Sequence, residues 1–406
     1  SPNDPIDISC SSNFPSELFD GIDINSGLVV FSSNQQFLLS SDDTVLNPDT
    51  AKLRSISTFN YNKDIPPISL GTTVAYLDNS GKFSRFNEMA NIAREGEPNV
   101  VNQSQVVPTL IPKNVDLFTN SRENNLVLIG KTDSDEVQGF RYLNVGDKRQ
   151  QSAWFKWKFN NPLKYHFVIN DEYYFLDTDN FLQEVRLVQT ESDPAIIQDN
   201  VDYLLHIDNH VEITGGQFDH PTNKTTFSGQ NWLNSVTTPN YDLVVIDTNT
   251  ASTRVGRYAK ATISGTSFTV PGDWSGASIF VGYLYEYKVL FPTFYLTQTQ
   301  GESARADVNS SLVIHRMKLH FGKIGLYETT LSRIGKNDYT EVYESTELDE
   351  YDVSDAPYVD EFIKTIPVYE RNTNVDITLK SQHPAPSTLR AVSWEGDFSP
   401  KYYKRV

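Results

Sequence analysis

The sequence has 406 residues, with 52 acidic and 34 basic side chains and a formal net charge of −18 at pH 7. An acidic surface repels nucleic acid, so this charge excludes a protein that grips DNA or RNA through a basic face. The single cysteine, Cys10, excludes an internal disulfide bond and indicates folding in a reducing compartment. No signal peptide is visible, and no apolar run approaches the roughly 18 residues of a membrane helix.

The composition favours β-structure. The chain holds 21 Tyr and 23 Phe but only 2 Met, and aromatic and β-branched residues prefer strands. At about 100–200 residues per domain, the length indicates two or three domains. We therefore predict an all-β protein with very little helix, in which partial β-propeller blades are followed by antiparallel, sandwich-like domains.

Residues 1–190 are predicted to form propeller blades. Apolar segments broken by Asn, Asp, Ser and Gly turns begin at Leu28, Thr73, Leu126 and Tyr165. Their spacing of about 40–50 residues is typical of propeller blades. Four such units are few for a closed propeller, so we expect upstream sequence or another chain to complete it.

Two short segments of this region depart from the hairpin pattern. The opening residues, Ile6 to Cys10, alternate like a strand and are expected to belong to a blade that begins upstream. In residues 85–96, the apolar side chains of Phe86, Met89 and Ala93 follow helical spacing. This spacing predicts a short linker helix that ends at the following glycine.

The strand patterns lengthen after residue 190. We predict an antiparallel β domain at 191–300 and a β-sandwich-like domain at 301–406, which ends in a basic, aromatic tail. The apolar face of one long strand is predicted to consist of Val313, His315, Met317, Leu319 and Phe321. His315 would then be a core histidine. A second two-faced strand is predicted to bury Val375, Ile377 and Leu379.

Two polar segments lack any period, at 296–311 and at 346–361. Both are predicted to be exposed loops, the second because it is strongly acidic. Long loops in compact domains are usually functional, so these two are candidate contact or gating elements.

Few residues suggest catalysis or metal binding. His206, Asp208 and His210 alternate along one strand face, with His220 ten residues beyond, but a metal site is the less favoured interpretation. Residues 177–181 resemble a calcium loop without its Gly and distal Glu, so a turn is predicted. No nucleophile elbow, P-loop or dinucleotide fingerprint is present. We therefore assign no catalytic, cofactor-binding or metal-binding residue and expect no cofactor.

One strand carries aromatic side chains on both faces. In residues 152–159, Trp154 shares a face with two lysines, while Phe155, Trp157 and Phe159 share the other. Basic and aromatic strands can stack nucleic-acid bases. Because the whole chain is acidic, a core or interface strand is the favoured interpretation.

A set of ordered segments resembles the tail nozzle protein family of short-tailed bacteriophages, also called tail tubular protein B. The resemblance covers nearly the whole chain, and its strength lies in the order and spacing of the segments rather than in any one of them. The segments are DPIDISCSSN (4–13), the hairpin GLVVFSSNQQFLLSS (27–41), IPKNVDLF (111–118), QQSAWFKWKF (150–159), VPG (270–272), VGYLYEY (281–287) and W-x-G (394–396).

The resemblance implies a structural protein of the virion tail rather than an enzyme. Family members form a homohexameric tube below the portal and the adaptor (tail tubular protein A) ring. Tail fibres dock outside, while genomic DNA and ejection proteins pass through the bore without specific binding. It also implies assembly in the host cytoplasm, no membrane segment, and a chain that corresponds to the C-terminal portion of a longer polypeptide.

Three functions remain open at this point. A structural nozzle is favoured, and an acidic wall past which DNA slides agrees with it, although solubility alone also explains the charge. The alternatives are a tail-associated polysaccharide hydrolase, since no pair of carboxylates can be excluded from sequence, and a glycan- or receptor-binding module.

Overall fold

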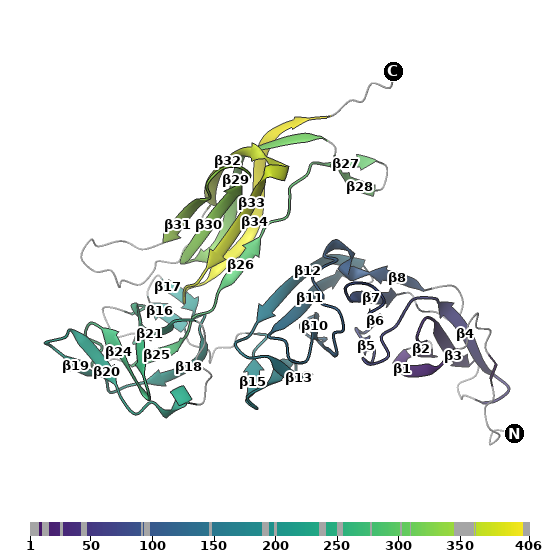
Figure 1. Cartoon of the computed structure of the whole chain (residues 1–406), viewed down its shortest axis with the longest axis horizontal. Helices are drawn as coiled ribbons and strands as arrows, with labels where there is room; N and C mark the ends of the chain where they lie inside the picture. The colour runs from purple at the N-terminus through teal and green to yellow at the C-terminus, as the bar shows by residue number, and fades with distance from the viewer. Residues whose placement is uncertain are drawn as a thin grey trace. The chain divides into compact units, whose positions relative to one another are not determined.

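The protein is almost entirely β-structure in its computed structural model (Figure 1). The structure describes residues 8–9, 16–24, 27–41, 47–90, 92, 98–145, 148–188, 195–198, 201–234, 241–249, 255–276, 278–300, 303–308, 310–344, 361 and 363–400. Within these ranges the helices are three short 3-10 turns, η1 (Gln103–Val106), η2 (Asn231–Asn234) and η3 (Asn372–Asn374). The all-β prediction is confirmed. The chain divides into two compact units, Ser1–Gln189 and Thr190–Val406.

The first unit consists of four successive antiparallel sheets, here called the first to fourth meanders. In each, strands adjacent in sequence are hydrogen-bonded neighbours, which is the strand order of a propeller blade. The first two comprise β1 (Leu18–Ile24), β2 (Gly27–Ser32), β3 (Gln36–Ser41), β4 (Ala51–Ser57) and then β5 (Ile68–Ser69), β6 (Val74–Asp78), β7 (Arg85–Ala90), β8 (Asn99–Asn102). The third and fourth comprise β9 (Leu117–Ser121), β10 (Leu126–Gly130), β11 (Glu136–Val145), β12 (Lys148–Lys158) and then β13 (Leu163–Ile169), β14 (Glu172–Asp177), β15 (Leu182–Val185).

The meanders pack face to face through three apolar clusters. Val29 and Phe31 of the first meander meet Val74 and Tyr76 of the second. The opposite face of the second meander packs on the third, and the opposite face of the third packs on the fourth. Central strands therefore have both faces buried, and all five residues of β6 and of β10 are buried.

The helix predicted over residues 85–96 is wrong. Residues 85–90 form strand β7, which pairs with β6 and β8. Phe86 packs in the cluster shared with the third meander, while Met89 packs in the cluster shared with the first. Residues three apart lie on opposite faces of a strand, and burial of both faces produced a spacing that resembles a helix.

Strand β12 is a core strand, as the sequence predicted. Trp154 packs against Phe86 and Phe140 between the second and third meanders. On the other face, Trp157 packs against Tyr173 of the fourth meander. The aromatic side chains are therefore used in packing between sheets.

The first part of the second unit contains a two-stranded and two four-stranded antiparallel sheets. The two-stranded sheet is β16 (Ala195–Gln198) and β17 (Val201–Leu204). The others, in spatial order, are β18 (Asp208–Ile213), β25 (Ile279–Tyr283), β21 (Leu243–Asp247), β22 (Tyr258–Lys260) and β19 (Gln217–Asp219), β20 (Lys224–Phe227), β24 (Ser267–Pro271), β23 (Thr262–Ser264). Val245 and Val281 pack against Phe227 and Phe268 between the larger sheets.

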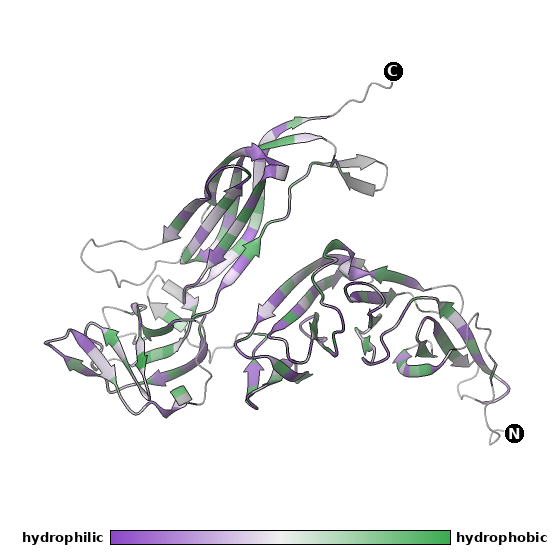
Figure 2. Ribbon diagram, viewed as in Figure 1, coloured by the Kyte–Doolittle hydropathy of each residue, from purple (hydrophilic) through white to green (hydrophobic). Residues whose placement is uncertain are grey.

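The last part of the chain forms a β-sandwich. One sheet has the order β26 (Tyr287–Leu290), β33 (Val375–Ser381), β30 (Leu326–Arg333), β31 (Tyr339–Glu344), and the other β32 (Ile363–Arg371), β29 (Ser311–Ile324), β34 (Ser387–Ser399). One apolar cluster joins the inner faces, and it includes Ile377 and Leu379 as predicted. Apolar and polar residues alternate along these strands (Figure 2).

The predicted inner face of β29 is wrong over its first half. From Leu312 to Phe321, the buried apolar side chains are Leu312, Ile314, Met317, Leu319 and Phe321. Ile314 and Arg316 pair with the adjacent residues Gly396 and Glu395 of β34, so His315 is an extra, bulged residue relative to β34. Relative to β32 the extra residue lies on β32, between Pro367 and Glu370. A bulge moves the alternation by one position. His315 is therefore no core histidine, because its side chain is 37% exposed and pairs with Asp397 at 3.2 Å.

Residues 296–311, predicted to be a loop, contain the hairpin of β27 (Thr297–Gln300) and β28 (Ser303–Ala306). Three other predictions fall wholly or largely outside the described residues: the opening strand Ile6 to Cys10, the acidic loop at 346–361 and the basic tail after residue 400. No helix in the described part of the chain is long and apolar enough to cross a membrane.

Candidate functional site

The histidines considered for a metal site have protein partners instead. His206 Nδ1 lies 2.9 Å from the hydroxyl of Tyr285, and burial lowers the pKa of His206. The ring of His210 packs against Phe280, and that of His220 packs against Phe218. Throughout the described ranges, no group of three or more His, Cys, Asp or Glu side chains is placed to hold a metal ion.

The calcium-like segment at 177–181 is a turn, as predicted. The carboxylate of Asp177 accepts a hydrogen bond from the backbone N–H of Phe181 at 2.8 Å. It also accepts one from Asn161 at 3.2 Å. These donors occupy the oxygens that a calcium ion would need, and the side chain closes the turn between β14 and β15.

A polar depression in the second unit is the candidate position for a hydrolytic site. It has a volume of about 460 Å³, and its lining includes Glu212, Thr248, Asn249 and Ser278. Glu212 is the one carboxylate in this lining, and it accepts a hydrogen bond from Ser278. Glycoside hydrolysis generally needs a pair of carboxylates. Among the described residues that line this depression, no second carboxylate completes such a pair.

The most developed polar cluster of the first unit surrounds Glu88 on β7, which is 4% exposed. Its carboxylate accepts hydrogen bonds from the hydroxyl of Thr73, the amide of Gln103 and the guanidinium of Arg149, each at 2.7 Å. The Arg149 guanidinium also lies 4.6 Å from the centre of the Tyr142 ring. Because Arg149 belongs to β12, this ion pair, in which Glu88 is buried and Arg149 is 22% exposed, joins the second meander to the third.

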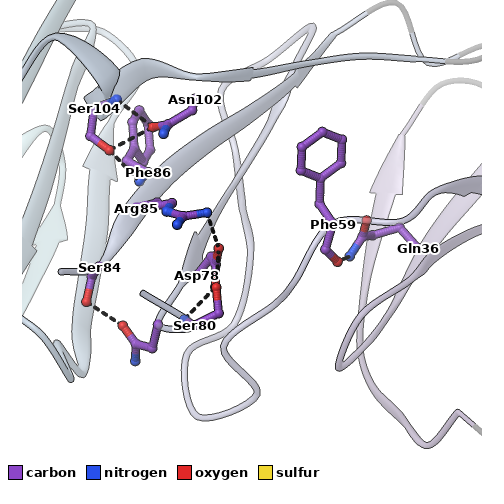
Figure 3. A network of polar contacts seen from close by, with 10 residues as sticks. Gln36, Phe59, Asp78, Ser80, Ser84, Arg85, Phe86, Asn102 and Ser104 are labelled. Atoms are coloured by element: carbon purple, nitrogen blue, oxygen red, sulfur yellow. Dashed lines mark hydrogen bonds and ion pairs between the residues drawn. The ribbon is translucent and has the colours of Figure 1, made fainter. Parts of the chain in front are cut away.

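The turns of the second meander are fixed by further polar contacts (Figure 3). Asp78 accepts a hydrogen bond from the backbone N–H of Ser80 at 2.7 Å and lies 3.7 Å from Arg85. The hydroxyl of Ser104 donates to Asn102 at 2.8 Å and accepts from the backbone N–H of Phe86 at 3.1 Å. These hydrogen bonds fix the connections between β6 and β7 and after β8.

A similar contact joins the third meander to the fourth. The buried His166 on β13 lies 3.1 Å from the Tyr173 hydroxyl, and its ring approaches Gly130 of the third meander. Burial lowers the pKa of His166 to about 4, against a weaker opposing effect of Asp116. Asp171 also accepts a hydrogen bond from Ser121 at 2.8 Å. His166 is thus neutral at pH 7 and acts as a packing residue.

Sequence reasoning did not identify Glu88 or His166. The only signal for Glu88 is its position in RFNEMA, where one charge interrupts an apolar segment that has no polar face. Thr73 and Gln103 lie next to β6 and β8 of the second meander, whereas Arg149 comes from the third, so the ion pair depends on how these two meanders stack. The polar contacts of the first unit therefore join packed sheets to one another.

A family model for the bacteriophage nozzle protein matches residues 1–405. The tail tubular protein gp12 of Escherichia phage T7 is 20% identical over 358 residues, which cover 83% of this chain and 43% of that protein. The chain therefore spans less than half the length of this curated relative.

Solved structures add no argument about the fold. Crystal structures of exo-β-1,3-galactanase from Phanerochaete chrysosporium were matched, one with galactotriose and one with galactose. They are 9% and 10% identical and cover 91% and 88% of this chain and 79% and 76% of theirs, each with a TM-score of 0.20. That score is too low to indicate a shared fold or activity. The family match, by contrast, extends over almost every residue, and the chain belongs to the bacteriophage nozzle protein family.

Proposed function

We propose that the chain is a structural subunit of the nozzle at the distal end of a phage tail, through which the genome leaves the particle. The observation that carries this proposal is the family match over residues 1–405. In this role the protein is a component of the virion, is assembled in the host cytoplasm, and performs no catalysis. Its partners are other copies of itself in a six-fold ring, the adaptor ring, and the tail fibres.

The chemistry of the chain supports a conduit for DNA. Neutralising a phosphate requires a lysine or arginine, and a wall with few free cations exchanges few counterions with DNA. The net charge of −18 per subunit, multiplied in a ring, would let DNA pass without adhering. The buried ion pair of Glu88 and Arg149 and the three packed cores suit a scaffold that must keep its shape.

The proposed division of the chain follows from its strand patterns. Residues 1–190 serve as blades of a propeller that upstream sequence or another chain completes. The antiparallel β domain predicted at 191–300 is proposed to end before β26, and the sandwich-like end with its basic tail is proposed to include that strand as well as residues 301–406, because β26 pairs with β33. The segments at 296–311 and 346–361 are proposed as contact or gating elements.

Genetic complementation in the phage tests the proposal. A phage with a nonsense codon in this gene, grown without suppression, should give particles whose tails lack the nozzle and which lose DNA. Plasmid-encoded protein should restore infectivity, and Glu212→Gln should restore it equally, since no carboxylate is catalytic. Complete tails in the nonsense mutant would contradict the nozzle role. Normal tails with lost infectivity in Glu212→Gln would support a hydrolase.

A further inference from the structure

Two bulges meet in the sandwich sheet formed by β32, β29 and β34. His315 of β29 is an extra residue relative to β34. On β32, an extra residue lies between Pro367 and Glu370, and Tyr369 belongs to this second bulge. The rings of His315 and Tyr369 lie 5.8 Å apart between centroids, with 21° between their planes. Both bulges therefore deliver an aromatic ring to the same spot on the sheet.

Tyr369 has a backbone conformation that a bulky side chain rarely adopts. Its φ of 45° lies in the left-handed region, where the Cβ of most residues is crowded by the backbone. The other non-glycine residues with positive φ in the described part of the chain are all Asn or Asp. The Tyr369 ring gains little burial in return, since it is 63% exposed. Strain of this kind persists mainly where it holds a functional group in position.

The W-x-G segment at 394–396 permits the bulge at His315. Gly396 pairs with Ile314, and a Cβ added at Gly396 would collide with the carbonyl oxygen of Val313. Only glycine allows two strands to approach so closely. One of the segments that resemble nozzle proteins therefore serves to place the His315 ring on the exposed face, where no part of the proposed function uses it.

Two charged groups flank the pair of rings. Nε2 of His315 lies 3.2 Å from the carboxylate of Asp397, whose side chain is largely exposed. Arg371, Val313 and Asp397 are paired across the three strands. Directly paired residues lie on the same face of a sheet, so Arg371 and Asp397 lie on this face at either side of β29. We call Tyr369, His315, Asp397 and Arg371 the ring site.

The chemistry of the ring site fits the face of a pyranose sugar. The face of an aromatic ring is negatively polarised and attracts polarised C–H groups. A β-D-hexopyranoside of gluco or galacto configuration presents three of these, the axial H1, H3 and H5, on one face. A carboxylate accepts hydrogen bonds from sugar hydroxyls, and a guanidinium donates to them. A protein partner fits less well, because charged residues are depleted from the centre of protein interfaces and the Arg316–Glu395 ion pair lies beside the site.

We propose that the ring site binds β-D-hexopyranosides of gluco or galacto configuration, with one sugar face stacked on Tyr369. Asp397 accepts hydrogen bonds from the sugar hydroxyls, Arg371 donates to them, and His315 holds the Tyr369 ring in position. Because the site is open and covers one face of the ligand, we expect a Kd of about 1–10 mM. The inference concerns the sandwich of a single chain and does not depend on the nozzle role.

Saturation-transfer difference NMR of the full chain tests the proposal. The probes are methyl β-D-glucopyranoside and methyl β-D-galactopyranoside. Mannitol is the control ligand, because it carries hydroxyls but has no ring face. At least one of the two glycosides should receive more saturation at H1, H3 and H5 than at its other ring protons, whereas mannitol should receive little.

Two variants and a matched control assign the signal to the ring site. Tyr369→Asn removes the ring but keeps a residue that tolerates positive φ, so affinity should fall about 10-fold while the urea midpoint stays unchanged or rises. Asp397→Asn should lower the affinity about 3-fold, since it removes a charge-assisted hydrogen bond. Tyr339→Asn should bind like the wild type, because Tyr339 is another exposed tyrosine of the same sandwich, on β31.

Three results would overturn the inference. They are the absence of saturation in both glycosides or equal saturation of mannitol, unchanged affinity in Tyr369→Asn, and a urea midpoint of Tyr369→Asn that falls as far as that of Ile314→Ala. The last would assign the ring to packing. If neither glycoside binds but Tyr369→Asn fails to complement the phage, a protein partner occupies the site instead.

Discussion

The meanders of the first unit and the sandwich of the second unit use β-sheets in different ways. A central meander is covered on both faces, so β6 and β10 are buried throughout and a charge such as Glu88 must have internal partners. A sandwich sheet has one inner and one outer face, so β33 alternates and its charged residues reach solvent. We therefore expect substitutions to be tolerated on the outer face of a sandwich strand but on neither face of a central meander strand.

The largest expected effect is loss of the buried charge pair in the first unit. Removing one partner of a buried ion pair typically costs about 3–5 kcal/mol. Glu88 keeps its hydrogen bonds from Thr73 and Gln103, and Arg149 is 22% exposed, so the lower end of that range, about 3 kcal/mol, applies here. We therefore expect Arg149→Met to lower the free energy of unfolding of the first unit by about that amount in urea titrations. Lys156→Met is the control, since its pair with Glu136 is about half exposed and contributes about 0–1 kcal/mol. Equal effects of the two would contradict the described packing.

The bulge in β29 predicts the next effect, in the sandwich. Ile314→Ala should cost about 2–5 kcal/mol, because it opens a cavity in the core. Val313→Ala should cost about 1 kcal/mol or less, since Val313 lies on the outer side. Thermal or urea unfolding of these two variants shows which of the two side chains of β29 faces the core. A larger loss of stability for Val313→Ala than for Ile314→Ala would instead support the uninterrupted alternation expected from the sequence.

Acid should weaken both units through buried histidines, His166 in the first unit and His206 and His383 in the second, because burial lowers the pKa of each. Burial lowers the pKa of His166 and of His383 from 6.5 to about 4. Below about pH 6.5 the unfolded chain binds protons that the folded chain excludes, so stability should be full above that pH and fall towards pH 4. His166→Gln should reduce this decline in the stability of the first unit. Urea midpoints at several pH values measure it. The exposed His220→Gln should leave it unchanged, and a His166→Gln profile as steep as the wild type would refute the assignment.

The smallest expected effect is at the bulged His315. Its contact with Asp397 is largely exposed, and such pairs contribute about 0–1 kcal/mol. His315→Ala should therefore shift the urea midpoint of the second unit only slightly. A loss comparable to that of Ile314→Ala would mean that the side chain packs in the core after all.

Hairpins were the most predictable part of the fold. The turn residues between β2 and β3, between β6 and β7, and between β10 and β11 were recognisable because Asn, Asp, Ser and Gly reverse a chain locally. By contrast, one apolar run at 279–290 becomes two strands in different sheets, β25 and β26. No pattern within residues 279–290 indicates which sheet each half of the run joins.

The candidate site was less predictable than the fold. Packing of Trp154 and Trp157 on opposite faces was inferred correctly, because the aromatic alternation is local. The Glu88 cluster could not be inferred, since Thr73 and Gln103 meet it only when the strands of the second meander pair, and Arg149 meets it only after the third meander has stacked on the second.

By itself, the sequence determined the all-β class, the hairpins, the acidic charge and the resemblance to nozzle proteins, because each depends on local patterns or on the order of segments. Tertiary structure alone decided that residues 85–90 are a strand, that β29 changes face at His315, and that Glu88 and Arg149 pair. These features depend on which surface covers each strand. That information is spread over distant residues, and a local period cannot carry it.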